Sequence, residues 1–221
     1  MSFAEYIILC FPAVFVILNP FSAASSFLSL TSGQSEEQQV SVAQRACITS
    51  FVVLMVFAVA GHFIFQVFQI TIQAFRIAGG IILFGIGMEM LQLKVTRTKQ
   101  TEEEMKEGMG KEDVAIVPLG IPLLSGPGAI TTIMVLTAEI SWKNKWAGLF
   151  QMGGLIISCA LSLVIIYFIL VNSKRLLDLF KITGVGLITR IMGLILTVIA
   201  TQFVISGVKD LLPEFAKLIQ H

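Results

Sequence analysis

The sequence predicts an all-α integral membrane protein whose six transmembrane helices form two inverted-topology three-helix repeats. Of its 221 residues, 56% are hydrophobic and only 13% are charged, and the mean hydropathy is +0.89. A soluble domain carries about 25% charged residues, so most of this surface must face something other than water. Six apolar segments are long enough to cross a bilayer, and motifs of the first half of the chain return in the second.

The six predicted spans occupy residues 4–31, 42–68, 74–93, 114–138, 147–171 and 187–208. Each reaches the length of about 20 residues that a helix needs to cross the hydrocarbon core. The first and fourth spans are interrupted near their middles, by Asn19-Pro20 and by Ser125-Gly126-Pro127-Gly128. Proline lacks an N–H and disfavours helical geometry in the residue before it. We therefore expect both spans to be broken near the bilayer midplane, with new half-helices beginning at Pro20 and Pro127.

The two halves of the chain share two motifs. The pattern Phe68-x-Ile70-Thr71, with Arg76-Ile77-x-Gly79-x-Ile81, returns as Phe180-x-Ile182-Thr183, with Arg190-Ile191-x-Gly193-x-Ile195. The break at Asn19-Pro20 likewise corresponds to Gly126-Pro127. A repeat of three spans must enter from the opposite membrane face, which is a layout common among secondary transporters. The predicted division is residues 1–93 for the first repeat, 94–113 for a charged loop and 114–221 for the second.

The distribution of basic residues predicts the orientation. Ten of the fifteen Lys and Arg residues fall on the side of the central loop, opposite the two termini. By the positive-inside rule, that loop is cytoplasmic and both termini are periplasmic. The net charge of +1 gives no reason to expect a nucleic-acid partner. The three scattered cysteines form neither a disulfide framework nor a metal cluster, and no P-loop pattern is present.

The two breaks are the predicted substrate site. Unsatisfied backbone groups in hydrocarbon cost several kcal/mol each, so such breaks persist where they line a cavity or meet a ligand. Helix starts at Pro20 and Pro127 offer N–H groups suited to a carboxylate, and the carbonyl ends before them suit an ammonium or a cation. A zwitterion would satisfy both poles. The candidate substrate-binding residues are Asn19, Pro20, Phe21, Ser22, Ala23, Ser125, Gly126, Pro127, Gly128, Ala129 and Thr131.

Three charged residues are candidates for gating or coupling. Arg76 and Arg190 stand at matching positions in the third and sixth spans, where an arginine ordinarily extends to the interface. Glu89, near the end of the third span, could carry a proton. The role of His62, in the second span, stays open. The glycines at 79, 80, 85 and 87 indicate close packing of the third span against another helix.

These motifs together resemble the MarC family, also called UPF0056. The residues that carry the resemblance are Asn19-Pro20, Phe75-Arg76-Ile77-Ala78-Gly79-Gly80, Pro118-Leu119-x-x-Pro122-x-x-x-Gly126-Pro127-Gly128-Ala129-Ile130 and Thr189-Arg190-Ile191-Met192-Gly193. The resemblance covers nearly the whole chain and implies a six-span protein of the prokaryotic inner membrane. It further implies transport of small neutral amino acids, as for glycine and alanine in the related SnatA proteins. Many members continue Asn-Pro-x-Gly-x-x-Pro, whereas Ser22 and Ser25 stand here for that glycine and proline.

The sequence thus predicts a secondary transporter of small neutral amino acids, such as glycine, alanine or serine, that acts without a cofactor or bound metal. Its partners would be the lipid bilayer, the amino acid and a coupling ion, either a proton or sodium. The direction of transport and assembly into a homo-oligomer stay open. The alternatives are an exporter or channel for another small polar metabolite, an intramembrane enzyme, and a structural or regulatory membrane subunit. An enzyme would need a buried nucleophile–base pair, which the sequence does not reveal.

Overall fold

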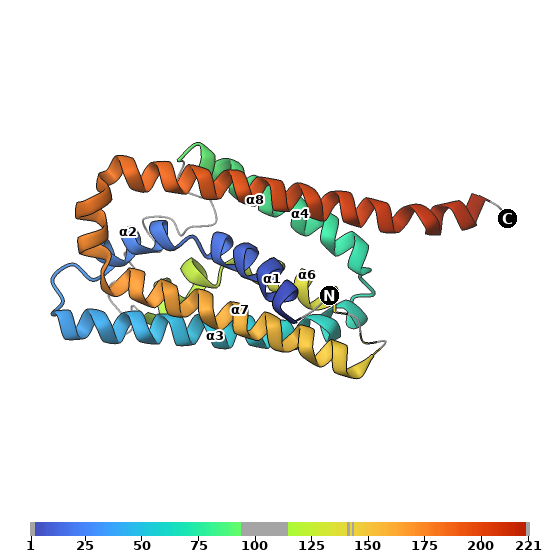
Figure 1. Ribbon diagram of the computed structural model, residues 1–221, viewed down its shortest axis with the longest axis horizontal. Coiled ribbons are helices and arrows are strands. Elements are labelled where there is room, and N and C mark those ends of the chain that lie inside the picture. The colour runs from blue at the N-terminus through green and yellow to red at the C-terminus, as the bar shows by residue number, and fades with distance from the viewer. Residues whose placement is uncertain (1–2, 94–114, 141, 143, 220–221) are drawn as a thin grey trace.

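A computed structural model describes residues 3–93, 115–140, 142 and 144–219, and this described part contains helices and no strands (Figure 1). Most helices run along the long axis of the molecule, and both chain ends lie toward the same end of that axis (Figure 1). An even number of membrane crossings requires this. The predicted loop from Lys94 to Asp113 and the side chain of His62 lie outside the described residues. The division of the chain at that loop therefore stays a prediction.

The first crossing is made of two helices, as the sequence predicts. Helix α1 (Phe3–Leu18) ends directly before Asn19, and α2 (Pro20–Leu30) begins directly after it. The second crossing, α3 (Glu36–Val67), starts at a capping box in which Ser35 and Gln38 satisfy each other's backbone N–H groups. The helix begins before the predicted span at residue 42, because the largely polar residues from Glu36 to Ser41 continue the helix beyond the apolar run.

The fourth crossing is also divided, more completely than predicted. A π-helix, η1 (Ala115–Leu124), is followed after Ser125 and Gly126 by α6 (Pro127–Ala138). Pro118 and Pro122 remove two N–H donors from η1, and the wide π pattern bonds the N–H of Ser125 to the carbonyl of Gly120 at 3.0 Å. Five helical segments of the described residues are long and apolar enough to cross a membrane alone. The fourth predicted span crosses as two short pieces instead.

The remaining crossings are α4 (Ile72–Leu91), α7 (Lys145–Val171) and α8 (Ser173–Ile219). Helix α8 bends at Lys181, whose φ of 54° is non-helical, so a short first segment precedes the long span from Thr183 to Leu212. Figure 1 shows this bend, after which α8 turns back along the bundle. The apolar side chains on the outer faces of α3, α7 and α8, such as Val59, Phe168 and Val198, are more than half exposed. Such faces meet lipid.

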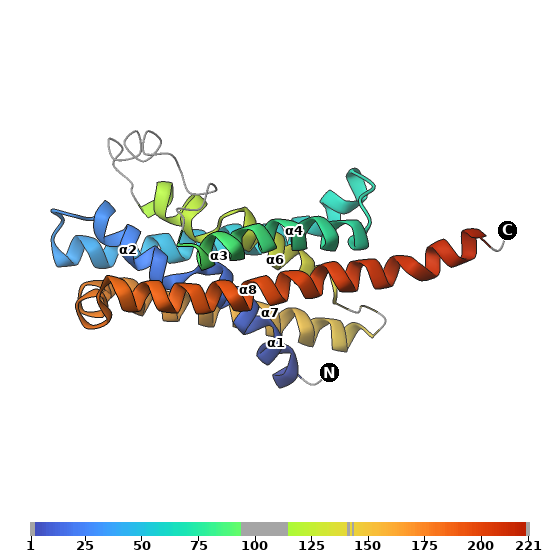
Figure 2. The same ribbon diagram turned by 90° about the horizontal axis from the view of Figure 1, so that it is seen from above.

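The helices pack as two bodies with separate apolar cores. One core joins α1, α2, α3, α6, α7 and η1, and the other joins α4 and α8 with a few residues of α1 and α6. Figures 1 and 2 both show α4 and α8 side by side along their lengths. Glycine permits this approach: a Cβ added at Gly87 would lie 2.5 Å from the Oγ1 of Thr197, and one at Gly193 would lie 2.8 Å from the carbonyl oxygen of Gly87.

The predicted glycine packing is confirmed at three of four positions. Gly79 packs against Thr131 of α6, and Gly80 and Gly87 pack against α8. The prediction is wrong for Gly85, which is exposed and where an added Cβ would meet nothing within 4 Å. Its position on the helix turns it away from both neighbours.

Candidate functional site

The first break is centred on Asn19. Its backbone adopts the left-handed conformation, with φ 47° and ψ 66°, which asparagine tolerates better than most residues. The N–H of Asn19 donates to the carbonyl of Val16 at 3.1 Å, and its side-chain oxygen accepts from the N–H of Ser22 at 3.4 Å. Asn19 therefore ends one helix and caps the next. The break predicted from Asn-Pro is confirmed at the predicted residue.

The second break is built differently. Gly126 is extended, Pro127 begins α6, and no side chain caps that helix start. In an α-helix the first N–H groups have no intrahelical acceptor, so those of Gly128 and Ala129 are oriented out of the helix end. On the other side of the break, the carbonyl of Gly120 accepts from the hydroxyl of Ser125 at 2.8 Å. The hydroxyl of Ser50 in α3 donates to the same carbonyl at 3.2 Å and fixes η1 against α3.

The two breaks meet through Gly128. A Cβ added there would lie 2.9 Å from the Cδ1 of Ile17 in α1 and 2.7 Å from the Cδ1 of Ile86 in α4. Ile17 lies two residues before Asn19, so the carbonyl end of α1 adjoins the N–H end of α6. The other two pieces of the broken crossings, α2 and η1, are also in contact with each other. Helix ends of opposite polarity from both halves of the chain thus converge.

Such an arrangement can bind a small dipolar molecule. An N-terminal helix end carries a partial positive charge of about one half and a C-terminal end the corresponding negative charge. A carboxylate is stabilised at the former and an ammonium at the latter. No Asp, Glu, Lys or Arg lies in the sequence between residues 16 and 24 or between residues 123 and 132. The convergent helix ends are therefore the principal polar groups there.

The predicted site residues differ in where the fold places them. Pro20, Ala23, Ser125, Gly128, Ala129 and Thr131 are buried, Asn19, Ser22 and Gly126 are half-buried, and Pro127 is exposed. The ring of Phe21 is directed toward Phe180 in the first segment of α8, with ring centroids 6.5 Å apart. Thr131 contacts Gly79 of α4 closely. The structure thus places Gly128 and Thr131 against α4, while Phe21 faces the bend in α8.

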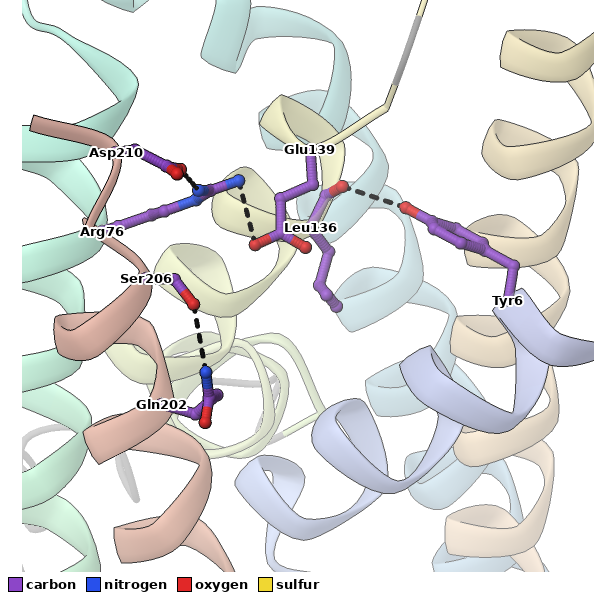
Figure 3. Close-up of polar contacts among 7 residues, drawn as sticks. All are labelled: Tyr6, Arg76, Leu136, Glu139, Gln202, Ser206 and Asp210. Carbon is purple, nitrogen blue, oxygen red and sulfur yellow. Dashed lines mark hydrogen bonds and ion pairs between the residues drawn. The ribbon is translucent and has the colours of Figure 1, made fainter. Parts of the chain in front are cut away.

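Arg76 contributes to an ion-pair cluster at the end of the bundle nearer the termini. Its guanidinium lies 3.1 Å from Oε1 of Glu139, directly after α6, and 2.5 Å from Oδ2 of Asp210 in α8 (Figure 3). Figure 3 also shows Tyr6 of α1, whose hydroxyl donates to the carbonyl of Leu136 at 3.0 Å. The Arg76 side chain is 14% exposed, so it lies mainly against the neighbouring helices. Polar contacts tie four helices together here.

The other two gating candidates have no such environment. Arg190 is exposed and forms no ion pair with the residues that the structure describes. Glu89 is half-buried in the last turns of α4, away from the cluster. The sequence symmetry between Arg76 and Arg190 is therefore not matched by their contacts.

A groove of about 460 Å³ lies between α3 and α7, away from both breaks. Its lining is largely apolar and includes Cys47, Ile48, Phe51, Leu163 and Tyr167. Because it opens on the outer, apolar face of the bundle, it is a surface for lipid.

Sequence reasoning missed four residues that matter at these places. Ile17 and Ile86 cover Gly128, and nothing in an apolar run distinguishes them from core residues. Glu139 and Asp210 are acids at the ends of apolar segments, and this placement was the available signal. Pairing them with Arg76 required the fold.

The broken, paired helices and the lipid-facing surfaces define a multi-pass helical integral membrane protein. The MarC family integral membrane protein model matches residues 4–212, and the chain belongs to this family. It is 36% identical over 209 residues to a UPF0056 membrane protein of Methanocaldococcus jannaschii, covering 94% of this chain and 98% of that relative. It is also 36% identical to the UPF0056 membrane protein YvbG of Bacillus subtilis, covering 95% and 97% of the two chains.

A further relative is the UPF0056 membrane protein YhcE of Escherichia coli, which is 31% identical over 92% of each chain. No solved structure matches the chain significantly. The family resemblance predicted from the motifs is thus confirmed.

Proposed function

We propose that this protein is a secondary transporter of small neutral amino acids in a prokaryotic inner membrane. The observation that supports this most directly is the contact of Gly128 with Ile17, which places helix ends of opposite polarity side by side. A free amino acid carries a carboxylate and an ammonium at a fixed short separation and so suits both ends. We propose a carrier and not an enzyme, because binding and moving an amino acid require neither a nucleophile nor a cofactor.

The size and charge of the proposed substrate follow from the surroundings of the breaks. Ala23, Ala24, Gly128 and Ala129 are small and buried, so the helices leave little room for a large side chain. A charged side chain there would be buried without a partner, at a cost of several kcal/mol. That cost disfavours Lys, Arg, Asp and Glu by about a thousandfold, at about 1.4 kcal/mol per tenfold. Glycine, alanine and serine are the preferred substrates.

Transport by purified protein in liposomes tests this proposal. Liposomes loaded with unlabelled alanine should take up radiolabelled alanine by exchange, and external glycine and serine should compete. Lysine and glutamate should compete weakly. Empty liposomes and liposomes carrying a Pro127→Ala variant serve as controls, because a longer, uninterrupted helix would cover the N–H groups of α6. Strong competition by lysine or glutamate, with none by alanine, would exclude the proposed substrate class.

A further inference from the structure

The cluster around Arg76 has an excess of negative charge. One guanidinium faces two carboxylates, those of Glu139 and Asp210, so the three ionised groups together carry a net charge of −1. An unbalanced charge in a partly desolvated place is costly. A single added proton would remove the imbalance.

Burial identifies the carboxylate that would take the proton. The side chain of Asp210 is 48% exposed and remains solvated, whereas that of Glu139 is 27% exposed. Glu139 also lies between helices, one residue beyond the end of α6, with α4 on one side and α1 on the other (Figure 3). Water can stabilise a charge on Asp210 far better than one on Glu139.

We propose that Glu139 is the proton-binding site of this carrier and that it is protonated when the Arg76–Glu139–Asp210 cluster is assembled. This inference rests on the proposed transport function and names its coupling ion. In the assembled state Asp210 keeps the ion pair with Arg76, and the neutral carboxyl of Glu139 still hydrogen-bonds the guanidinium. When the helices separate, Glu139 meets water and releases the proton.

The groups that face Glu139 agree with this assignment. They are Arg76 from α4, Asp210 from α8, and Tyr6 and Cys10 from α1. Burial raises the pKa of Glu139 above its usual value; Arg76 opposes this and Asp210 adds to it. The state with the higher pKa binds protons more tightly, so protons favour the assembled cluster over a hydrated, open one.

The cluster is connected to the proposed substrate site through two helices. Arg76 and Ile86 both belong to α4, and Glu139 and Gly128 lie at opposite ends of α6. At 1.5 Å per residue, the ion pair lies about 15 Å from the contact of Ile86 with Gly128. Separating α4 from α6 at the cluster would also withdraw Ile86 from the start of α6. Protonation would thereby be linked to closure of the site.

Among the residues that the structure describes, this charged cluster occurs at one end of the molecule. In the sequence repeat, Arg190 corresponds to Arg76. When Pro20 is aligned with Pro127, the residue aligned with Glu139 is Ser32. A serine carries no charge, so Ser32 cannot form the corresponding ion pair with Arg190. The sequence repeat therefore gives the two ends of the molecule different groups at these matching positions.

Two measurements on Glu139→Gln test the inference, with Glu37→Gln as the matched control. Glu37 is an exposed acid in the first turn of α3, far from the cluster. In liposomes, Glu139→Gln should retain exchange of radiolabelled alanine and lose accumulation driven by an imposed pH gradient. In detergent, titration of the purified variant with a pH indicator should show one proton fewer bound above the usual titration range of a glutamate carboxyl, because the pKa of Glu139 is raised by burial. The control should match the wild type in both measurements.

Each outcome is decisive. Accumulation or proton binding by Glu139→Gln at the wild-type level would overturn the inference, as would accumulation driven by a sodium gradient alone. If Glu139→Gln aggregates on gel filtration, Glu139→Asp replaces it: it should shift the midpoint of proton binding, and an unchanged midpoint overturns the site. If the wild type exchanges no alanine while Glu139→Gln still binds one proton fewer, the proton site stands and the amino-acid substrate is wrong.

Discussion

Ile17 of α1 and Gly128 of α6 are in direct contact, and any Cβ at Gly128 would approach the Cδ1 of Ile17 to 2.9 Å. The contact joins the last turn of one half-helix to the first turn of another from the opposite half of the chain. The carbonyl end of α1 thereby lies beside the N–H end of α6, and unpaired backbone groups at either end would be costly in a membrane.

Gly128→Ala should abolish alanine exchange while the protein still inserts. The added methyl group overlaps Ile86 and Ile17, and overpacking of this kind costs about 1–3 kcal/mol. It also displaces the side chains that close over the α6 start. Exchange in liposomes and thermal unfolding in detergent measure the two effects. Gly85→Ala is the control, since its Cβ meets nothing within 4 Å; equal behaviour of the two variants would contradict the prediction.

Asn19→Ala should destabilise the protein more than Asn19→Gly. Both variants lose the side-chain bond to Ser22, yet only alanine resists the left-handed conformation at residue 19, by about 1–2 kcal/mol. Glycine adopts it freely. Thermal unfolding of the two purified variants provides the comparison. If the alanine variant were the more stable, the left-handed break would not be needed for the fold.

The loop between the two halves should be cytoplasmic. The basis is the distribution of the fifteen Lys and Arg residues, ten of which fall on the side of this loop. The three native cysteines are buried and can be replaced, and a single cysteine placed at Glu103 then reports on this side. It should resist impermeant thiol reagents in intact spheroplasts and react after lysis. Rapid labelling before lysis would reverse the orientation.

The thermal stability of the wild type should fall with rising pH more steeply than that of Glu139→Gln. Burial raises the pKa of Glu139 in the folded protein, so its contribution to stability is present at low pH, below the pKa of the unfolded chain. The contribution is lost as the pH rises through the raised, folded-state pKa, where the buried carboxyl must ionise. Glutamine stays neutral throughout. Unfolding temperatures across this window should converge at low pH, and parallel curves would contradict the assignment.

Much of the fold was predictable because the bilayer restricts the choices of the chain. An apolar run of about 20 residues has few alternatives to a spanning helix, and proline within such a run has a local steric effect. The ends of α1 and α2 therefore fall at Leu18 and Pro20 as expected. The family could likewise be inferred from motifs that stand close together in sequence.

The sequence by itself determined the helical membrane class, the two broken crossings and the residues at each break, since all of these depend on local chemistry. Only the tertiary structure decided that Ile17 and Ile86 cover Gly128, and that Arg76 is shared by Glu139 and Asp210. These contacts join residues far apart in the chain, and their partners depend on how α4 and α8 pack against the other helices. For the same reason two arginines at matching repeat positions have different environments: local sequence places each within a helix, and packing decides which residues each contacts.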